Sequence, residues 1–174
     1  MTLFVPKTSR DFATFWGQVP TVHWESSKLE KISISAESKQ FLMEIGLPQL
    51  SDWTLRFETS PSWGTSGLLL LGFDGPNPVC LARGDRVDSV VLQELRQGPT
   101  RFVNGTVAQF GCFLALYQQY RLQVREIDEN TDGSRIDELI NDVERAMRNA
   151  DGAALDSAGN YWHLILGQAR AGLL

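Results

Sequence analysis

The chain contains few residues of the kinds that carry catalysis or bind transition metals. Among its 174 residues there are two cysteines, Cys80 and Cys112, and two histidines, His23 and His163. The cysteines lie far apart and form no CxxC pair, so we expect reduced thiols that pack in the core. Neither histidine has a sequence context typical of a catalytic triad. We therefore expect no metal, no cofactor and no enzymatic activity.

Long apolar runs are also absent. No stretch approaches the roughly 18 apolar residues that a membrane-spanning helix needs. The first residues, MTLFVPKTSRDF, show no basic segment followed by an apolar one, as a secretion signal would require. The sequence therefore predicts neither secretion nor membrane insertion, and a cytoplasmic location.

Basic residues are too few to balance the acidic ones. The chain has 16 lysines and arginines against 21 aspartates and glutamates, which gives a formal net charge of -5. Such a surface repels phosphate backbones and anionic lipids, so neither nucleic acid nor membrane is an expected partner. It can instead speed association with a basic protein, such as a nuclease domain. The alternative is that the charge only keeps a small domain soluble.

No complete motif for nucleotide or calcium binding is present. Residues 64–67 are glycine-rich but lack the lysine and the spacing of a phosphate-binding loop, and no GxGxxG follows a strand. Residues 128–133 begin like a calcium-binding loop, but its twelfth position is Leu139 where that loop needs a bidentate glutamate. We therefore interpret this segment as a connection between helices.

Apolar residues at helical spacing predict two helices in the first third of the chain and three in the last. The first helix covers residues 9–16 with Ser9 as N-cap, and the second runs from the cap Ser35 to Ile45 and ends at Gly46. Thr106 begins the third as a capping box with Gln109. The remaining two begin at Ser134, with Asp137 completing a weaker box, and at Tyr161, the latter running to Ala171.

Between the helices the pattern indicates strands. Short apolar runs separated by Gly, Pro, Asn and Asp predict strands at residues 54–59, 68–73, 79–82, 87–92 and 100–103. A further short strand is expected where Ile32 and Ile34 alternate with serines. This order of elements favours a single α+β domain over residues 1–174, with a central, mostly antiparallel sheet covered by helices.

Tryptophan is plentiful, with five residues at positions 16, 24, 53, 63 and 162. Trp63 lies in the segment SPSWG, which resembles a loop, so it is a candidate anchor for a protein partner; packing inside the protein is the alternative. The acidic residues Asp74, Asp85, Asp88 and Glu94 are the expected charged rim around it. These five residues form the predicted partner-binding site.

Four stretches in the same order resemble the SUKH superfamily of bacterial immunity proteins, and most closely its fourth family. They are FLMEIGLP at 41–48, RFVNGTVAQF at 101–110, DGAAL at 151–155 and YWHLILGQARAGLL at the C-terminal end. Asn104 and Thr106 match the asparagine and small hydroxyl residues of that family, and Gly105 replaces its usual serine. At the matching positions Gly46 suits a backbone turn, Phe110 and Trp162 suit packing, and Thr106 suits a helix cap.

The resemblance implies an α+β fold with a mostly antiparallel sheet. It also implies a cytoplasmic protein without enzymatic activity that binds the effector domain of a cognate toxin and neutralises it, by occluding its active site. One alternative is a regulatory protein-interaction module outside toxin systems. The other is an enzyme or small-ligand protein, which requires a deep pocket with convergent polar groups.

Overall fold

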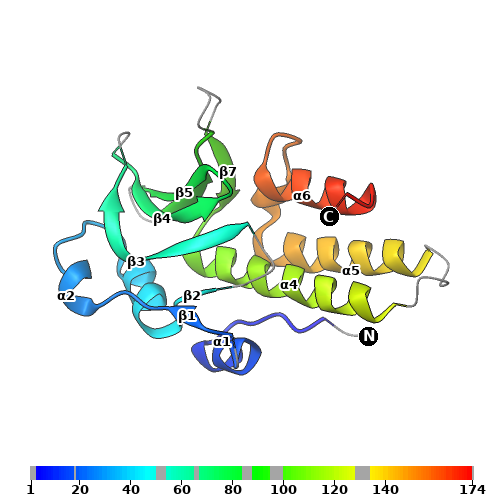
Figure 1. The fold of residues 1–174 in the computed structure, drawn as a ribbon, viewed down its shortest axis with the longest axis horizontal. Helices are drawn as coiled ribbons and strands as arrows, with labels where there is room; N and C mark the ends of the chain where they lie inside the picture. Colours follow the sequence, from blue (N-terminus) through cyan, green and yellow to red (C-terminus); the bar gives the residue numbers. More distant parts are fainter. Residues whose placement is uncertain are drawn as a thin grey trace.

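The computed structural model describes residues 3–17, 19–49, 54–64, 67–83, 88–94, 100–127 and 134–173. The calcium-like segment 128–133 and the first residue of the strand predicted at 87–92 lie outside the described residues. Helical segments occupy both ends of the chain and strands occupy its middle (Figure 1). Within the described residues, no helix combines the length and the apolar character needed to cross a bilayer.

The helical elements follow the predicted order. In chain order they are α1 (Ser9–Trp16), α2 (Ser26–Leu29), α3 (Ala36–Gln40) with the π-helical turn η1 (Phe41–Ile45), α4 (Val107–Glu126), α5 (Ser134–Asp151) with the 3-10 turn η2 (Gly152–Leu155), and α6 (Tyr161–Arg170).

The strands form two antiparallel sheets. The small sheet pairs β1 (Thr21–Val22) with β2 (Leu47–Pro48). The larger sheet has the order β3-β4-β5-β6-β7, in which every strand pairs with its neighbour in sequence. Its strands are β3 (Leu55–Trp63), β4 (Leu69–Asp74), β5 (Asn77–Ala82), β6 (Ser89–Leu92) and β7 (Arg101–Asn104). The α+β class and the antiparallel sheet predicted from the sequence are confirmed.

The helices cover one face of the larger sheet. The strand register places Leu69, Leu81, Val90 and Asn104 in one cross-strand row, and each of these residues is at most 1% exposed. This face contributes to the main core together with α4, which runs beneath the sheet, and α6 (Figure 1).

The other face of the sheet carries a second cross-strand row of apolar side chains. Here the register aligns Leu70, Cys80, Val91 and Phe102. Cys80 is fully buried, although it lies on the face opposite the main core. The neighbouring edge strand β3 is bulged between Phe57 and Ser62, where its pairing with β4 shifts in register. A side chain built at Gly64 would begin 4.0 Å from Oε1 of Gln93, at the end of β6.

The helix before β2 ends at the predicted glycine but closes with a wider turn. Ser35 caps α3 as expected, since its Oγ accepts a hydrogen bond from the amide of Ser38 at 3.1 Å. At the other end the amide of Gly46 donates to the carbonyl of Phe41 at 2.8 Å, five residues back. Gly46 has φ 72° and ψ -176°, which is outside the left-handed helical region common at helix ends but is equally restricted to glycine.

Two local predictions were wrong. The N-cap of α1 is Thr8, not Ser9, because Thr8 and Asp11 exchange hydrogen bonds in a complete capping box. Ile32 and Ile34 form no strand in the structure. Their amides instead donate to the carbonyls of Leu29 and Ile32 at 3.1 Å each, so the chain turns after α2.

Replacement of Gly46 by alanine should destabilise the fold severely. A Cβ at this position would lie 2.5 Å from the carbonyl oxygen of Val22, a backbone atom that cannot rotate away. This clash adds to the strain of placing alanine at a positive φ. We therefore expect the free energy of unfolding to fall by about 3 kcal/mol or more. Gly172 is the matched control, since it has φ 66° with nothing within 4 Å of an added Cβ. Urea unfolding of both variants tests this, and equal losses would contradict the steric argument.

Candidate interaction surface

Trp63 is the most exposed of the described tryptophans, with 49% of its surface accessible. It lies at the end of β3 and pairs with Leu69, so the segment that we predicted as a loop is a strand. The pairing fixes the backbone that presents the indole. Trp63 therefore has the accessibility that a partner anchor requires.

Asp74, one of the predicted rim residues, is engaged inside the protein. Its carboxylate accepts hydrogen bonds from the hydroxyl of Thr54 and, at 3.1 Å, from that of Tyr161 on α6. Burial, together with the neighbouring Asp74 carboxylate, raises the pKa of Tyr161 well above its ordinary value, so the phenol remains a donor. Asp74 thus joins the end of β4 to the last helix.

Glu94 is part of an ion pair at the same end of the sheet. Its carboxylate accepts a hydrogen bond from Nε of Arg101, whose Nη1 donates to the carbonyl of Gly159 at 2.9 Å. The two side chains are 30% and 26% exposed, so Glu94 remains partly available to a partner.

Asp88 does not belong to an exposed rim. It is 2% exposed, and its Oδ2 accepts a hydrogen bond at 2.7 Å from the amide of Ser35, the N-cap of α3. A buried carboxylate needs such donors, and here it fixes the start of α3 to β6. The remaining predicted residue, Asp85, lies outside the described residues. Of the predicted rim, Asp74 and Glu94 remain partly accessible, but Asp74 pairs with Leu55 at the start of β3, at the opposite end of that strand from Trp63.

A buried polar network joins three of the stretches that carry the resemblance. The indole of Trp162 donates to Oδ1 of Asn104 at 2.8 Å, and Nδ2 of Asn104 donates to Oδ2 of Asp151 at 3.0 Å. The same Oδ2 accepts the amide of Gly105 at 2.9 Å. Trp162 and Asn104 are fully buried, and Asp151 is 7% exposed. The network fixes the ends of β7 and α5 to α6.

The predicted capping box at the start of α4 is only half formed. Thr106 Oγ1 accepts the amide of Gln109 at 3.1 Å, as expected. The side chain of Gln109 instead donates from Nε2 to the carbonyl of Ala150 at 3.1 Å, which links α4 to the end of α5. Its Oε1 is buried without a hydrogen-bond partner, 2.9 Å from the point where a Cβ on Gly105 would lie.

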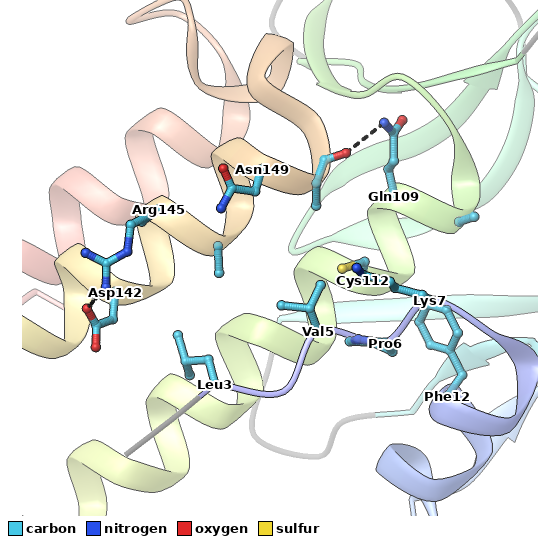
Figure 2. Close-up of a pocket in the computed structure, with 13 residues that line it drawn as sticks. Leu3, Val5, Pro6, Lys7, Phe12, Gln109, Cys112, Asp142, Arg145 and Asn149 are labelled. Carbon is cyan, nitrogen blue, oxygen red and sulfur yellow. Dashed lines mark hydrogen bonds and ion pairs between the residues drawn. The ribbon is translucent and has the colours of Figure 1, made fainter.

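An open apolar groove of about 660 Å³ lies between the N-terminal segment, α4 and α5 (Figure 2). The groove was not foreseen from the sequence, because its walls are distant in the chain. Figure 2 shows Leu3 and Val5 on one side and α5 on the other. Its apolar lining consists of Leu3, Val5, Pro6, Phe12, Ala108, Cys112, Ala146 and Ala150.

Polar groups line this groove mainly at its margins. Lys7 extends over Cys112, while Asp142 and Arg145 form an ion pair within α5 (Figure 2). Burial raises the pKa of the Cys112 thiol to about 11, against an opposing effect of Lys7, so the thiol is neutral at physiological pH. Among the described residues, no group of three or more His, Cys, Asp or Glu is arranged to hold a metal ion.

Comparison with known proteins identifies one family. The family model described as SUKH-4 immunity protein matches residues 8–168. The matched range contains Trp63, the buried network and most of the residues that line the groove. No curated protein and no solved structure matches the chain.

Substitution of Trp162 by phenylalanine should cost more stability than the same change at Trp16. Both indoles are at most 3% exposed, but Nε1 of Trp16 has no partner, whereas that of Trp162 bonds Asn104. The first variant leaves a buried amide oxygen unsatisfied, so we expect an additional loss of about 1–3 kcal/mol. Thermal and urea unfolding of the two variants give the difference, and indistinguishable losses would show that the network adds no stability.

A serine at position 105 should stabilise the fold relative to an alanine there. The new Oγ would lie close to the unpartnered Oε1 of Gln109 and can donate to it, after a small shift of that flexible side chain. We expect Gly105→Ser to exceed Gly105→Ala by roughly 1 kcal/mol in unfolding free energy. Alanine adds the same Cβ without the donor. A serine variant no more stable than the alanine variant would refute this role of the hydroxyl.

Proposed function

The chain belongs to the SUKH-4 immunity protein family, and on this premise we propose that it protects the cell that makes it by binding and neutralising the effector domain of a cognate toxin. The observation that carries the proposal is the family match over residues 8–168, nearly the whole chain. In this proposal the protein acts in the cytoplasm and by binding alone, without turning over a substrate.

The proposed contact surface is centred on Trp63 at the end of β3. Two side chains hold this edge strand in place before it reaches Trp63. The indole of Trp24 donates to the carbonyl of Glu58 at 2.6 Å, and Nε2 of Gln49 donates to the carbonyl of Phe57 at 3.2 Å. A large aromatic side chain on an anchored backbone loses little conformational freedom on binding, which favours its use as an interface anchor.

Charge supports a basic partner. The net charge of -5 attracts a cationic domain over long range, and Glu94 provides a partly exposed carboxylate. Nuclease-type toxins are commonly basic because they hold phosphates, so they are the partner class that we propose. The protein would neutralise such a domain by covering its active site with this preformed surface.

The direct test uses the toxin domain encoded beside this chain. Co-expression should protect cells from the toxin, and the purified proteins should form a complex by isothermal titration calorimetry. Trp63→Ala should weaken that complex by about 30-fold or more if the indole is an interface anchor. Leu164→Ala is the matched control, because Leu164 is 38% exposed on α6.

Varying the ionic strength distinguishes long-range electrostatic attraction from direct contacts in the same complex. The association rate should fall as ionic strength rises, while the effect of Trp63→Ala should persist in the dissociation rate. Absence of both complex and protection would remove the proposed function. A complex that tolerates Trp63→Ala would leave the function standing and place the contact surface elsewhere.

A further inference from the structure

The N-terminal segment forms a fixed wall of the apolar groove. The amide of Phe4 donates to Oε1 of Gln119 on α4 at 2.9 Å, and Nε2 of Gln119 donates to the carbonyl of Phe4 at 2.6 Å. The residues on either side of Phe4, Leu3 and Val5, line the groove. Because this wall is tied to α4 before anything binds, a ligand would have little of the site to order.

The groove has the size and the lining of a site for a small molecule. Its volume of about 660 Å³ lies within the range of roughly 300–1,000 Å³ that is usual for ligand sites. Along α5 its lining runs from Asp142 to Ala150, a distance of about 12 Å at the helical rise of 1.5 Å per residue. The surface between these ends is mainly apolar, so it suits an alkyl chain of medium length.

One positive charge over the groove has no counter-charge. The ammonium group of Lys7 lies over Cys112 and opposes the effect of burial on the pKa of that thiol, as a nearby cation should (Figure 2). Among the described residues no carboxylate forms an ion pair with it. The acid nearest in sequence, Asp11, instead accepts the backbone amides of Lys7 and Thr8, at 3.0 and 2.8 Å. The ammonium group is therefore available to an anion in the groove.

The remaining charges of the lining cancel each other. Asp142 and Arg145 form an ion pair within α5. With Lys7 the lining has two cations and one anion, so the groove is positive in a chain whose net charge is -5. Figure 2 places Lys7 and Asp142 toward opposite ends of the groove. An anionic group is therefore favoured at the Lys7 end, and an uncharged chain toward the Asp142 end.

From these observations we propose that the groove binds a small amphipathic carboxylate, with the chemistry of a medium-chain fatty acid. The carboxylate pairs with the Lys7 ammonium group above Cys112. The alkyl chain lies between Leu3 and Val5 on one side and Ala146 of α5 on the other. This activity is separate from toxin binding and does not rest on it.

Isothermal titration calorimetry of the full chain with decanoate, below its micelle concentration, tests the site. We expect saturable binding of one decanoate per chain. Octanoate should bind about tenfold more weakly, because two methylene groups fewer leave water. Decanol has the same chain without the charge, and it should bind about fivefold more weakly or less tightly still.

Substitution of Lys7 tests the position of the carboxylate. Lys7→Gln should weaken decanoate binding about fivefold or more and leave decanol binding unchanged, whereas Lys7→Arg should retain the preference for decanoate. Lys31→Gln is the matched control, since it makes the same change of charge at an exposed lysine that does not line the groove. It should leave both ligands unaffected.

Filling the groove tests the position of the alkyl chain. Ala146→Phe should abolish binding of both ligands, while Ala13→Phe adds the same ring at an exposed position on α1 and should not. Amide chemical shifts measured by NMR should move on titration at the residues that line the groove. Circular dichroism and thermal unfolding of each variant verify the fold.

Three results would overturn the proposal. They are no binding of decanoate up to its micelle concentration, equal affinity for decanol and decanoate, and chemical shift changes that lie away from the groove. A decanoate affinity that Lys7→Gln and Lys31→Gln reduce equally would likewise refute the carboxylate site. All these measurements omit the toxin, so their failure leaves the proposed function intact.

Discussion

The side chain of Asn104 is the point on which the arrangement of the C-terminal half depends. It is fully buried, and it accepts from Trp162 while it donates to Asp151. Each bond satisfies a polar group that would otherwise lose its hydration without compensation. Because the partners sit on α6 and at the end of α5, the strand end β7 sets the position of both helices. The half-formed cap of α4 adds a second link, through Gln109 to Ala150.

This arrangement has a consequence for where surfaces are left free. The helices that the network holds in place cover one face of the sheet, while β3 remains at its edge. Accessible apolar groups therefore gather in two separate places, at Trp63 on the sheet and at Phe4 and Leu122 beside α4.

Local sequence signals predicted the elements well. Helical periodicity and helix caps depend on residues that are close together in the chain. The structure confirms Ser35 and Thr106 as N-caps and Gly46 as the end of its helix. The poor strand formers in SPSW predict a loop at Trp63, but the structure pairs Trp63 with Leu69 on the neighbouring strand, and this pairing overrides the local preference.

The predicted site was harder to anticipate. Asp88 reads as a surface acid in the sequence, and only the amide of Ser35, 53 residues away, shows why it is buried. Asn104, Asp151 and Trp162 likewise meet only in the fold. The sequence offered two signals: Asn104 ends an apolar strand, and Asp151 lies at the end of a helix. Neither signal identifies its partner, since hydrogen bonds between distant segments leave no periodic trace in the sequence.

The anchoring of β3 by Trp24 and Gln49 has a further effect. The outermost strand of an open sheet offers unpaired carbonyls and amides, onto which a foreign strand can add and begin aggregation. Here the carbonyls of Phe57 and Glu58 are already occupied by side chains from the preceding segment. These two carbonyls are therefore not free to accept amides from a foreign strand, which makes this part of β3 a poorer template for edge-to-edge aggregation.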